Sequence, residues 1–373
     1  MSPVASIIVT NHNYGRWLRE AIDSALNQTY GGIEVVVVDD GSTDDSREII
    51  ASYGARITPV LQPNLGQAAA INAGFAASTG DPVLVLDADD VLRATAIERA
   101  VEALRDPAVA QVHWLHHVID EDSRLTGELF PSGLEELPEG DLREAIARFG
   151  PGTLLTTPTS GNVFRRSVLE RIMPITAEVR MCADQHMIQL VPLLGNVARL
   201  SEPQSHYRRH GSSGFASVLF DDQLELGYDV MEQLMGVCAS WCGEVGLDAD
   251  VAQWRRSSWY HALRHIVGEL DRLSPDGRPI LLIDDGQTGM ENSRVRSVLP
   301  FPSRDGIWWG AVAGDDEAIA QLEHHRERGA AHLAVMWTAV WWLDHYRGFA
   351  AHLSERYRRV CDDDLVTVFD LSG

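Results

Sequence analysis

Residues 83–90 read Val83-Leu84-Val85-Leu86-Asp87-Ala88-Asp89-Asp90, an apolar run followed at once by an acidic turn. A short, continuous apolar run is typical of a strand that is covered on both faces of a sheet. Carboxylates this close together repel one another, and a hard divalent cation with oxygen ligands offsets that repulsion. The residues alone leave a second interpretation open, in which the turn is solvated and Asp90 caps the next helix.

The same pattern occurs earlier, where the Val-rich residues 35–38 are followed by Asp39-Asp40-Gly41-Ser42. A carboxylate after a parallel strand can accept a hydrogen bond from a nucleobase or from a ribose hydroxyl. A turn that caps the next helix also accounts for Gly41 and Ser42, although it explains two consecutive acids less well.

Strand and helix patterns alternate through the first hundred residues. We expect strands at 5–9, 33–38, 56–61 and 82–86, with helices at 17–28, 43–53 and 66–78. Strands rich in Val and Ile that are separated by helices indicate an α/β fold, a mostly parallel sheet flanked by helices. Ligands bind beyond the carboxyl ends of such strands, which is where both acidic clusters lie.

The remainder of the chain is less regular. We expect a helix at 94–104, a strand at 109–117, a helical stretch at 221–273 and a break at Ser274-Pro275-Asp276-Gly277. Strands at 279–284, 332–337 and 366–371 and helices at 316–328 and 341–357 follow. We therefore predict a first domain at 1–214, a helical connecting region at 215–273 and a small α/β module of unknown role at 274–373. Its tryptophans are expected in a buried core or an interface rather than at a ligand-binding surface.

The composition excludes several partners. The net charge is −23, from 31 Lys and Arg against 54 Asp and Glu, so nucleic acid and anionic membranes are disfavoured. An anionic substrate would need local compensation from a cation and a few Arg or His residues. No apolar run approaches the ~20 residues of a membrane span, and the start lacks a secretory pattern, so we expect a cytoplasmic protein. Of the four cysteines, Cys238 and Cys242 are interpreted as two small buried residues rather than as a metal site or a disulfide.

Five segments together carry a family resemblance. They are residues 7–14 (Ile-Ile-Val-Thr-Asn-His-Asn-Tyr), 26–30, 37–44, 64–74 and 86–90. In this order and spacing, over about 210 of the 373 residues, the chain resembles the family 2 glycosyltransferases with the GT-A fold. The resemblance implies a nucleotide-sugar transferase fold at residues 1–214.

The resemblance also implies a donor site. It assigns the nucleotide-sugar to residues at the strand ends and in nearby loops, namely Thr10, Asn11, Asp39, Asp40, Asn64, Gln67, Asp87, Ala88, Arg208 and Arg209. Asp40 would face the base with Thr10 beside it, and Asp87 would lie near the ribose. Asp89, with Asp87, would ligate a Mn²⁺ or Mg²⁺ that bridges the diphosphate. The basic residue sometimes found in the loop at 64–67 is absent here.

Two later segments extend the resemblance. Met181-Cys182-Ala183-Asp184-Gln185-His186 matches the place of the family's catalytic carboxylate, although Ala183 replaces a frequent second acid. Asp184 would act as the base that takes a proton from an acceptor hydroxyl, whereas the residues alone favour a helix cap. The segment 206–213 resembles the family's Tyr-Arg-x-His motif. His210 would then join the cation's ligands, and Arg208 or Arg209 would pair with the diphosphate. Residues 160–166 resemble a segment near the acceptor.

These implications predict an inverting, metal-dependent hexosyltransferase-type enzyme. Its donor would be a nucleotide-diphosphate sugar, and its acceptor a hydroxyl of a glycan, a lipid-linked or a small molecule. A degenerate transferase that serves as a carbohydrate-binding scaffold is one alternative, and a nucleotidyltransferase is another. The latter normally opens with a basic, Gly-rich loop, which residues 10–15 are not. A dinucleotide oxidoreductase lacks its Gly-x-Gly-x-x-Gly after Val9. We expect no nucleic-acid partner and no integral membrane segment, and leave a homo-oligomer open.

Overall fold

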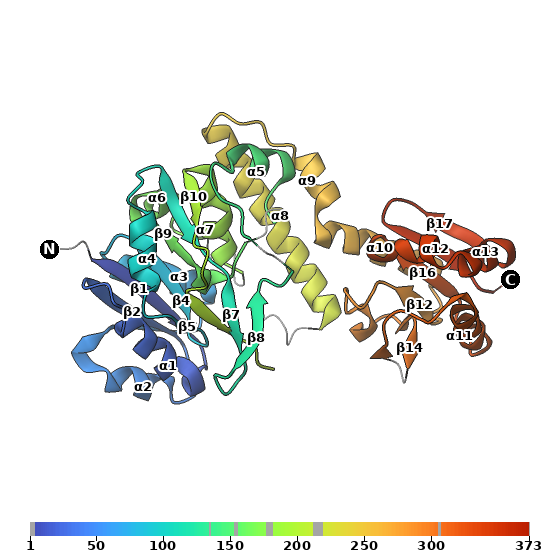
Figure 1. The fold of residues 1–373 in the computed structure, drawn as a ribbon, viewed down its shortest axis with the longest axis horizontal. Helices are drawn as coiled ribbons and strands as arrows, with labels where there is room; N and C mark the ends of the chain where they lie inside the picture. The colour runs from blue at the N-terminus through green and yellow to red at the C-terminus, as the bar shows by residue number, and fades with distance from the viewer. Residues whose placement is uncertain are drawn as a thin grey trace. The chain divides into compact units, whose positions relative to one another are not determined.

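The computed structural model describes residues 4–133, 136–152, 156–176, 182–211, 219–304 and 307–372. The chain divides into two compact units (Figure 1). Unit 1 comprises residues 1–213 and 230–257, and unit 2 comprises residues 214–229 and 258–373. The helical residues 215–273, expected as one connecting region, are thus shared between the units. Met181 and the expected boundary at residue 214 lie outside the described residues.

Unit 1 is built on a seven-stranded sheet with the order β10-β6-β9-β4-β1-β2-β3. All neighbouring pairs are parallel except those of β9, which runs antiparallel to β4 and β6. The strands are β1 (Ala5–Asn11), β2 (Ile33–Asp40), β3 (Thr58–Gln62), β4 (Val83–Asp87), β6 (Val109–His113), β9 (Asn162–Phe164) and β10 (Asn196–Arg199). The parallel α/β architecture expected from the sequence is confirmed.

Helices cover both faces of this sheet. Because alternate side chains of a strand point to opposite faces, Val36 and Val38 of β2 join one core, and Val35 and Val37 join the other. The second core is closed by α1 (Gly15–Leu26), α2 (Ser46–Ser52) and α4 (Ala96–Ala103). The first is closed by α3 (Gln67–Ala77), α5 (Arg143–Phe149), α6 (Arg166–Ile172), α7 (Asp184–Leu190), part of α8 (Phe220–Glu244) and α9 (Val251–Ser257).

A smaller sheet in unit 1 has the order β5-β11-β7-β8. Its strands are β5 (Val91–Leu92), β7 (His116–Ile119), β8 (Leu125–Phe130) and β11 (Ser205–Arg208). The single strand expected at 109–117 is wrong, because the chain leaves the large sheet after His113 and enters the small sheet at His116. Trp114, at the break, is fully buried and donates its indole N–H to the hydroxyl of Ser205 (2.7 Å).

Unit 2 has its own five-stranded sheet, with the order β13-β12-β16-β18-β17. The strands are β12 (Ile280–Ile283), β13 (Val298–Pro300), β16 (His332–Met336), β17 (Arg358–Asp362) and β18 (Val366–Asp370). One face is covered by α11 (Asp315–Glu327), α12 (Trp341–His345) and α13 (Arg347–Arg356), and the other by α10 (Trp259–Leu273) and the start of α8. The sequence predicted three of these five strands.

The tryptophans of unit 2 divide between its core and its surface. Trp342 is fully buried, as expected for a Trp-rich core, whereas Trp309 and Trp341 are exposed. Among the helices that the structure describes, none combines the length and the apolar character that a bilayer span requires.

Candidate active site

The carboxyl ends of β1 and β4 bring the first predicted site residues together. The parallel register pairs Thr10 with Asp87, and the Thr10 hydroxyl lies 3.5 Å from Asp87 Oδ1. The next residue, Ala88, is buried and donates its backbone N–H to the Thr10 carbonyl (3.2 Å). Thr10, Asp87 and Ala88 therefore share one edge of the sheet.

Strand β11 fixes the acidic turn after β4 from the other side. His210 Nε2 lies 2.9 Å from Asp89 Oδ2, and the imidazole packs 4.2 Å from the Trp17 ring. Asp90 Oδ1 accepts the backbone N–H of Arg208 (3.0 Å), while its buried Oδ2 has no hydrogen-bond partner. His210, 121 residues away in the sequence, thus joins the acidic turn, as the resemblance implied.

Asp184 is the fourth acid near the turn that carries Asp87, Asp89 and Asp90, and it comes from α7 on the other side of the site. It is the first residue of α7 and is nearly buried, and its charge raises the pKa of Asp87. Gln67, the first residue of α3, accepts the backbone N–H of Ala183 (2.9 Å). Gln185 donates a hydrogen bond to Asp184 Oδ2 (3.3 Å). The donor-side loop and the start of α7 are therefore directly linked.

Burial and mutual repulsion dominate the electrostatics of this group. Burial, with Asp89 and Asp184 nearby, raises the pKa of Asp87 to about 8. Burial also raises the pKa of Asp184, against the opposing hydrogen bonds from Thr159 and Gln185. The pKa of Asp90 is raised by burial and by the neighbouring carboxylates of Asp89 and Asp87. The site therefore carries more negative charge than its protein partners offset.

The second acidic cluster is bonded within the protein. Asp39 is fully buried and accepts hydrogen bonds from Asn11 Nδ2 (3.1 Å), the Ser42 N–H (3.2 Å) and Arg47 Nε (2.7 Å). Burial alone would raise the pKa of Asp39, but the bonds from Ser42, Arg47 and Asn11 lower it. Asn11 and Asp39 therefore hold the turn after β2.

Asp40 performs a similar task for the loop after β3. Its two carboxylate oxygens accept the N–H groups of Leu65 (2.9 Å) and Gly66 (2.8 Å) and the amide of Gln62 (2.7 Å). A side chain at Gly41, which has a positive φ of 73°, would lie 2.4 Å from the Asn64 nitrogen. The sequence pattern contained no signal for Arg47 or Gln62 as partners of these acids.

Asn64 lies at the rim of the same edge. Its side chain is exposed, and its amide nitrogen lies 3.1 Å from His12 Nε2. The other nitrogen of His12 contacts the Asp40 carbonyl at 2.7 Å. The loop that the resemblance places near the donor is therefore tied to the turn after β2.

The two predicted arginines have different surroundings. Arg208 is buried, and its guanidinium donates to the Asp89 and Asp120 carbonyls, to Ser123 and to Glu20. Arg209 is half-exposed and pairs with Glu128. The Arg208 guanidinium thus ties the acidic turn after β4 to the turn at residues 120–123.

The acidic group offers oxygen ligands that a hard cation prefers, but its side chains do not yet form a complete coordination shell. The carboxylates of Asp87 and Asp89 are ligands that suit Mn²⁺ and Mg²⁺, whereas the imidazole of His210 is a nitrogen ligand that a transition metal accepts more readily than Mg²⁺ does. The unpartnered oxygen of Asp90 and the raised pKa of Asp87 show charge that a cation would relieve. Within the described ranges, no group of three or more Asp, Glu, His or Cys side chains is already arranged to hold a metal ion.

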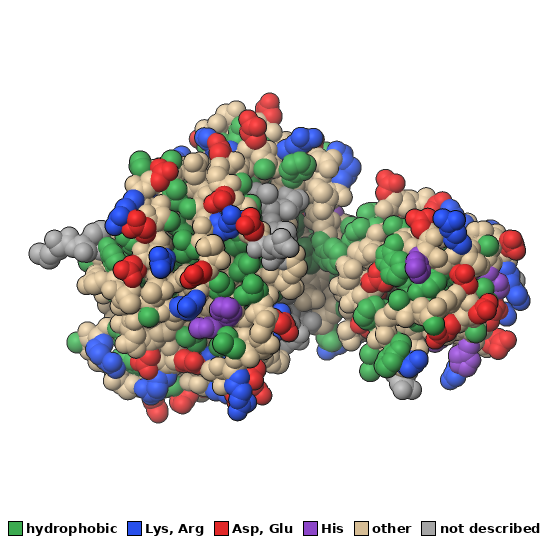
Figure 2. Space-filling view, in the orientation of Figure 1, with side chains coloured by type: hydrophobic (Ala, Val, Ile, Leu, Met, Phe, Trp, Pro, Cys, Tyr) green, Lys and Arg blue, Asp and Glu red, His purple; other side chains and the backbone are tan. Residues whose placement is uncertain are grey.

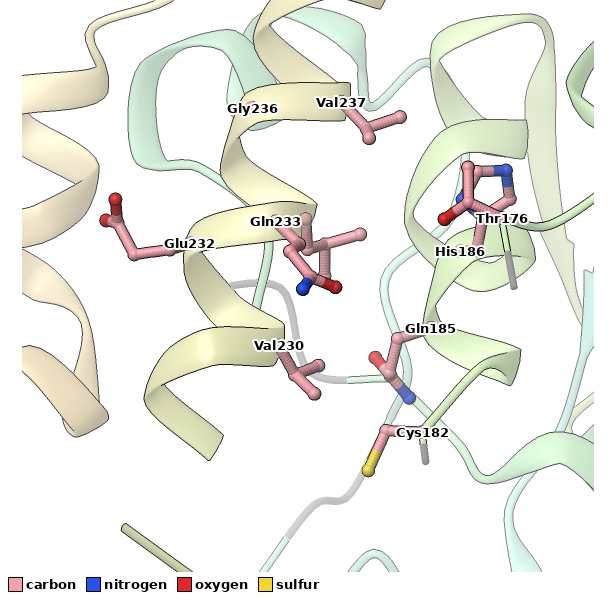
Figure 3. Close-up of a pocket in the computed structure, with 10 residues that line it drawn as sticks. Thr176, Cys182, Gln185, His186, Val230, Glu232, Gln233, Gly236 and Val237 are labelled. Carbon is pink, nitrogen blue, oxygen red and sulfur yellow. The ribbon is translucent and has the colours of Figure 1, made fainter. Parts of the chain in front are cut away.

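A cavity of about 270 Å³ lies between α7 and α8, close to Asp184. Figure 3 shows Gln185 and His186 on one side and Val230, Gln233 and Val237 of α8 on the other. Glu232 points away from α7 and pairs with Arg255. Gln185 connects the cavity to Asp184, because it lines the cavity and bonds that carboxylate. The described residues that line the cavity include no Lys or Arg.

Comparison with known proteins gives the family. Residues 6–173 match the model of glycosyl transferase family 2. The chain is 40% identical over 219 residues to an uncharacterized glycosyltransferase of Nostoc sp., covering 57% of this chain and 66% of that relative. It is 26% identical over 260 residues to an uncharacterized glycosyltransferase of Haemophilus influenzae, covering 67% and 77%. The chain thus spans about two thirds of the length of the Nostoc relative.

A solved structure shows the same fold. The TarS protein of S. aureus (residues 1–349, in complex with UDP-GlcNAc) superposes with a TM-score of 0.50 at 20% identity, over 73% of each chain. The likeness to TarS shows the fold alone, the GT-A arrangement of a mostly parallel sheet, here with the acidic clusters at its carboxyl edge. The family model and the Nostoc relative show that the domain at residues 6–173 belongs to glycosyltransferase family 2. The expectations of fold, family and enzyme class are confirmed.

Proposed function

We propose that unit 1 is an inverting, cation-dependent glycosyltransferase that moves a sugar from a nucleotide-diphosphate donor to an acceptor hydroxyl. The observation that carries this proposal is the position of Asp184. Its nearly buried carboxylate lies in the electrostatic field of Asp87, and burial raises its pKa. A raised pKa brings a carboxylate closer to the proton affinity that a general base needs near neutral pH.

The donor belongs at the carboxyl ends of β1, β2 and β4. Thr10, Asn64 and Gln67 offer hydroxyl and amide groups there, and Asn11, Asp39 and Asp40 set the shape of the turn and of the loop beside it. Asp87, Asp89 and His210 would hold the Mn²⁺ or Mg²⁺. A bound cation would neutralise the diphosphate of the departing nucleotide. Arg209, half-exposed and directly after β11, which ends at the buried Arg208, is a candidate contact for that diphosphate.

The acceptor would approach Asp184 from the side of the cavity between α7 and α8. Gln185 bonds the Asp184 carboxylate and fixes its orientation. Asp184 accepts the proton of the acceptor hydroxyl as the hydroxyl oxygen attacks the anomeric carbon, and the nucleotide leaves from the opposite face.

A panel of nucleotide-sugars tests the donor and the cation together. We expect one donor to raise the melting temperature of the protein only when Mn²⁺ or Mg²⁺ is present, and to be hydrolysed slowly without acceptor. Asp89→Asn should weaken this cation-dependent binding at least tenfold while changing unfolding little, because the Asn oxygen can still contact His210 but no longer offers the cation a negative charge. Asp122→Asn, at a surface acid that pairs with Arg124, is the control. Donor and Mn²⁺ binding like the parent in Asp89→Asn would refute the cation assignment.

A further inference from the structure

The sheet of unit 2 has a topological switch point between β12 and β16. These two neighbouring strands are parallel to each other, and β12 is also parallel to β13 on its other side. After β12 the chain crosses to β13, whereas after β16 it crosses to β17 and β18 on the opposite side. The two connections therefore diverge at the carboxyl ends of β12 and β16. Crevices of this kind are where open α/β sheets bind their ligands.

The loop after β12 is held in one conformation. Asp284 is buried and accepts the N–H groups of Gly286 (3.0 Å) and Thr288 (3.0 Å). Asp285 has a positive φ of 55°, which is costly for a residue other than Gly, so contacts with the surrounding structure must hold it in this conformation. That carboxylate accepts the indole N–H of Trp341 (2.6 Å) and of Trp342 (3.1 Å).

Two indole rings with solvent-facing surface, those of Trp308 and Trp341, contact this loop, and a third exposed indole, Trp309, follows Trp308 in the chain. Trp341 is 40% exposed, although its N–H is bonded to Asp285 and its ring also packs near Trp342 (5.7 Å), His345 (5.7 Å) and Tyr346 (6.2 Å). Trp308, 37% exposed, covers the loop so closely that a side chain at Gly286 would lie 2.9 Å from its ring. Trp309 is 61% exposed and packs 4.2 Å from the Arg304 guanidinium. Figure 2 shows hydrophobic side chains gathered at the β14–β15 hairpin (Ser303–Arg304 and Ile307–Trp308).

The exposed indole rings and the charges around them indicate which class of ligand this surface would bind. Exposed Trp faces carry a negative quadrupole and attract the weakly positive C–H face of a sugar ring. Among the described residues at 284–288, 303–304, 307–309 and 337–342, Arg304 is the one cationic side chain, and it is stacked on Trp309. With acidic residues in the loop and a net charge of −23, the surface disfavours phosphate, sulfate and uronate groups.

We propose that the carboxyl edge of the unit 2 sheet is a binding site for an uncharged oligosaccharide, with Trp308, Trp309 and Trp341 stacking on its sugar rings. The site is separate from the donor site of unit 1 and does not depend on the cation. In a glycosyltransferase such a site would hold a growing neutral glycan near the enzyme between transfer steps.

The experiment uses the full chain and defined neutral oligosaccharides (cellohexaose, maltoheptaose, chitohexaose and mannohexaose) without nucleotide or cation. Binding is followed by titration calorimetry and by the change in Trp fluorescence. We expect at least one of these probes to bind at micromolar to millimolar concentration, and Trp309→Ala and Trp341→Ala each to weaken it about tenfold. Trp309→Phe and Trp341→Phe should retain part of the affinity, because they keep an aromatic face.

Matched controls keep the proposal open to refutation. Val340→Ala removes an exposed apolar side chain beside Trp341, and Phe149→Ala removes an exposed aromatic from unit 1. Both should bind like the parent. The proposal is overturned if no neutral probe binds, if polygalacturonate binds more tightly, or if the tryptophan variants match the controls. It is also overturned if sedimentation shows that Trp309→Ala dissociates an oligomer, since the surface would then contact a second copy of the chain. None of these four results would change the outcome of the donor assay of unit 1.

Discussion

At the scale of single residues, Asp184 is where burial and the helix dipole oppose each other. A helix N-terminus stabilises a carboxylate, yet the net effect on Asp184 is a raised pKa, with burial as the largest cause. Asp184→Asn keeps the shape and removes the base, so we expect turnover to fall roughly 10²–10⁴-fold with donor affinity little changed. Steady-state transfer and donor calorimetry measure the two quantities separately.

A capping aspartate supplies the control for that experiment. Asp250 precedes α9 and accepts the N–H of Gln253 (2.8 Å), and Asn caps a helix about as well as Asp. Asp250→Asn should therefore leave turnover unchanged. Turnover near the parental value in Asp184→Asn would return Asp184 to the same capping role.

Arg208 and Arg209 are adjacent in sequence, but replacing each should lower the free energy of unfolding by a different amount. Arg208→Met removes the buried guanidinium and leaves the Asp89 and Asp120 carbonyls without their donor. We expect the free energy of unfolding to fall by about 2–3 kcal/mol, less than for a fully buried ion pair because Glu20 is partly exposed. Arg209→Met breaks only a surface pair and should cost about 0.5 kcal/mol or less. Urea unfolding measures both, and weaker donor binding without destabilisation in Arg208→Met would contradict this interpretation.

Part of the site was predictable because the carboxyl ends of parallel strands must meet. That rule places Thr10 beside Asp87, and the family resemblance adds Asp184 and His210, which the structure brings to the same edge. The partners of Asp39 and Asp40 were not predictable, since they depend on how α2 and the loop at 62–66 close over the turn. The chemical roles of these residues stay predictions.

At the scale of elements, two buried histidines make the junction of β6 and β7 sensitive to acid. Burial lowers the pKa of His116 to about 3 and that of His113 to about 4, from an ordinary value of 6.5. Both histidines are neutral in the folded and the unfolded chain above pH 6.5, so the fold keeps its full stability there. As the pH falls from 6.5 towards the folded-state pKa, the unfolded chain binds protons that the folded chain does not, and stability is lost. For each such histidine the loss is at most about 1.4 kcal/mol per pH unit.

His116→Gln isolates this effect, because glutamine does not titrate. The variant should be less stable than the parent at pH 7, where it loses the contact of His116 with Ser205 (2.8 Å). The difference should shrink by up to about 2 kcal/mol at pH 5, since only the parent then bears the cost of protonating His116. Unfolding by urea at the two pH values measures the change, and a difference that does not depend on pH would rule out His116 as the acid-sensitive group.

The accuracy of the predicted elements follows from their burial. Each of the four strands expected in the first hundred residues is found within a few residues of its expected bounds; β1, β2 and β4 are largely buried runs of Val, Ile and Leu, whereas β3 is a mostly exposed edge strand. Strand β17 was missed because it is an edge strand with exposed Arg358 and Arg359, which gives no apolar pattern. Strand β13 was missed because it is short and ends in Pro300.

At the scale of the whole molecule, the boundary of unit 2 determines where the chain can be cut. Helix α10 belongs to unit 2, and its residues Leu263, Ile266, Val267 and Leu270 pack against the sheet strands there. A chain that ends at Leu273 would expose all four side chains, at a cost of about 6–12 kcal/mol in lost burial, so it should aggregate. A chain that ends at Ser257 omits α10 and should be the more soluble of the two, with donor binding retained. Both truncations leave the start of α8 uncovered, so the comparison isolates α10. The soluble fraction after expression and donor-dependent melting measure the outcome, and equal solubility of the two truncations would show that α10 does not need the sheet of unit 2.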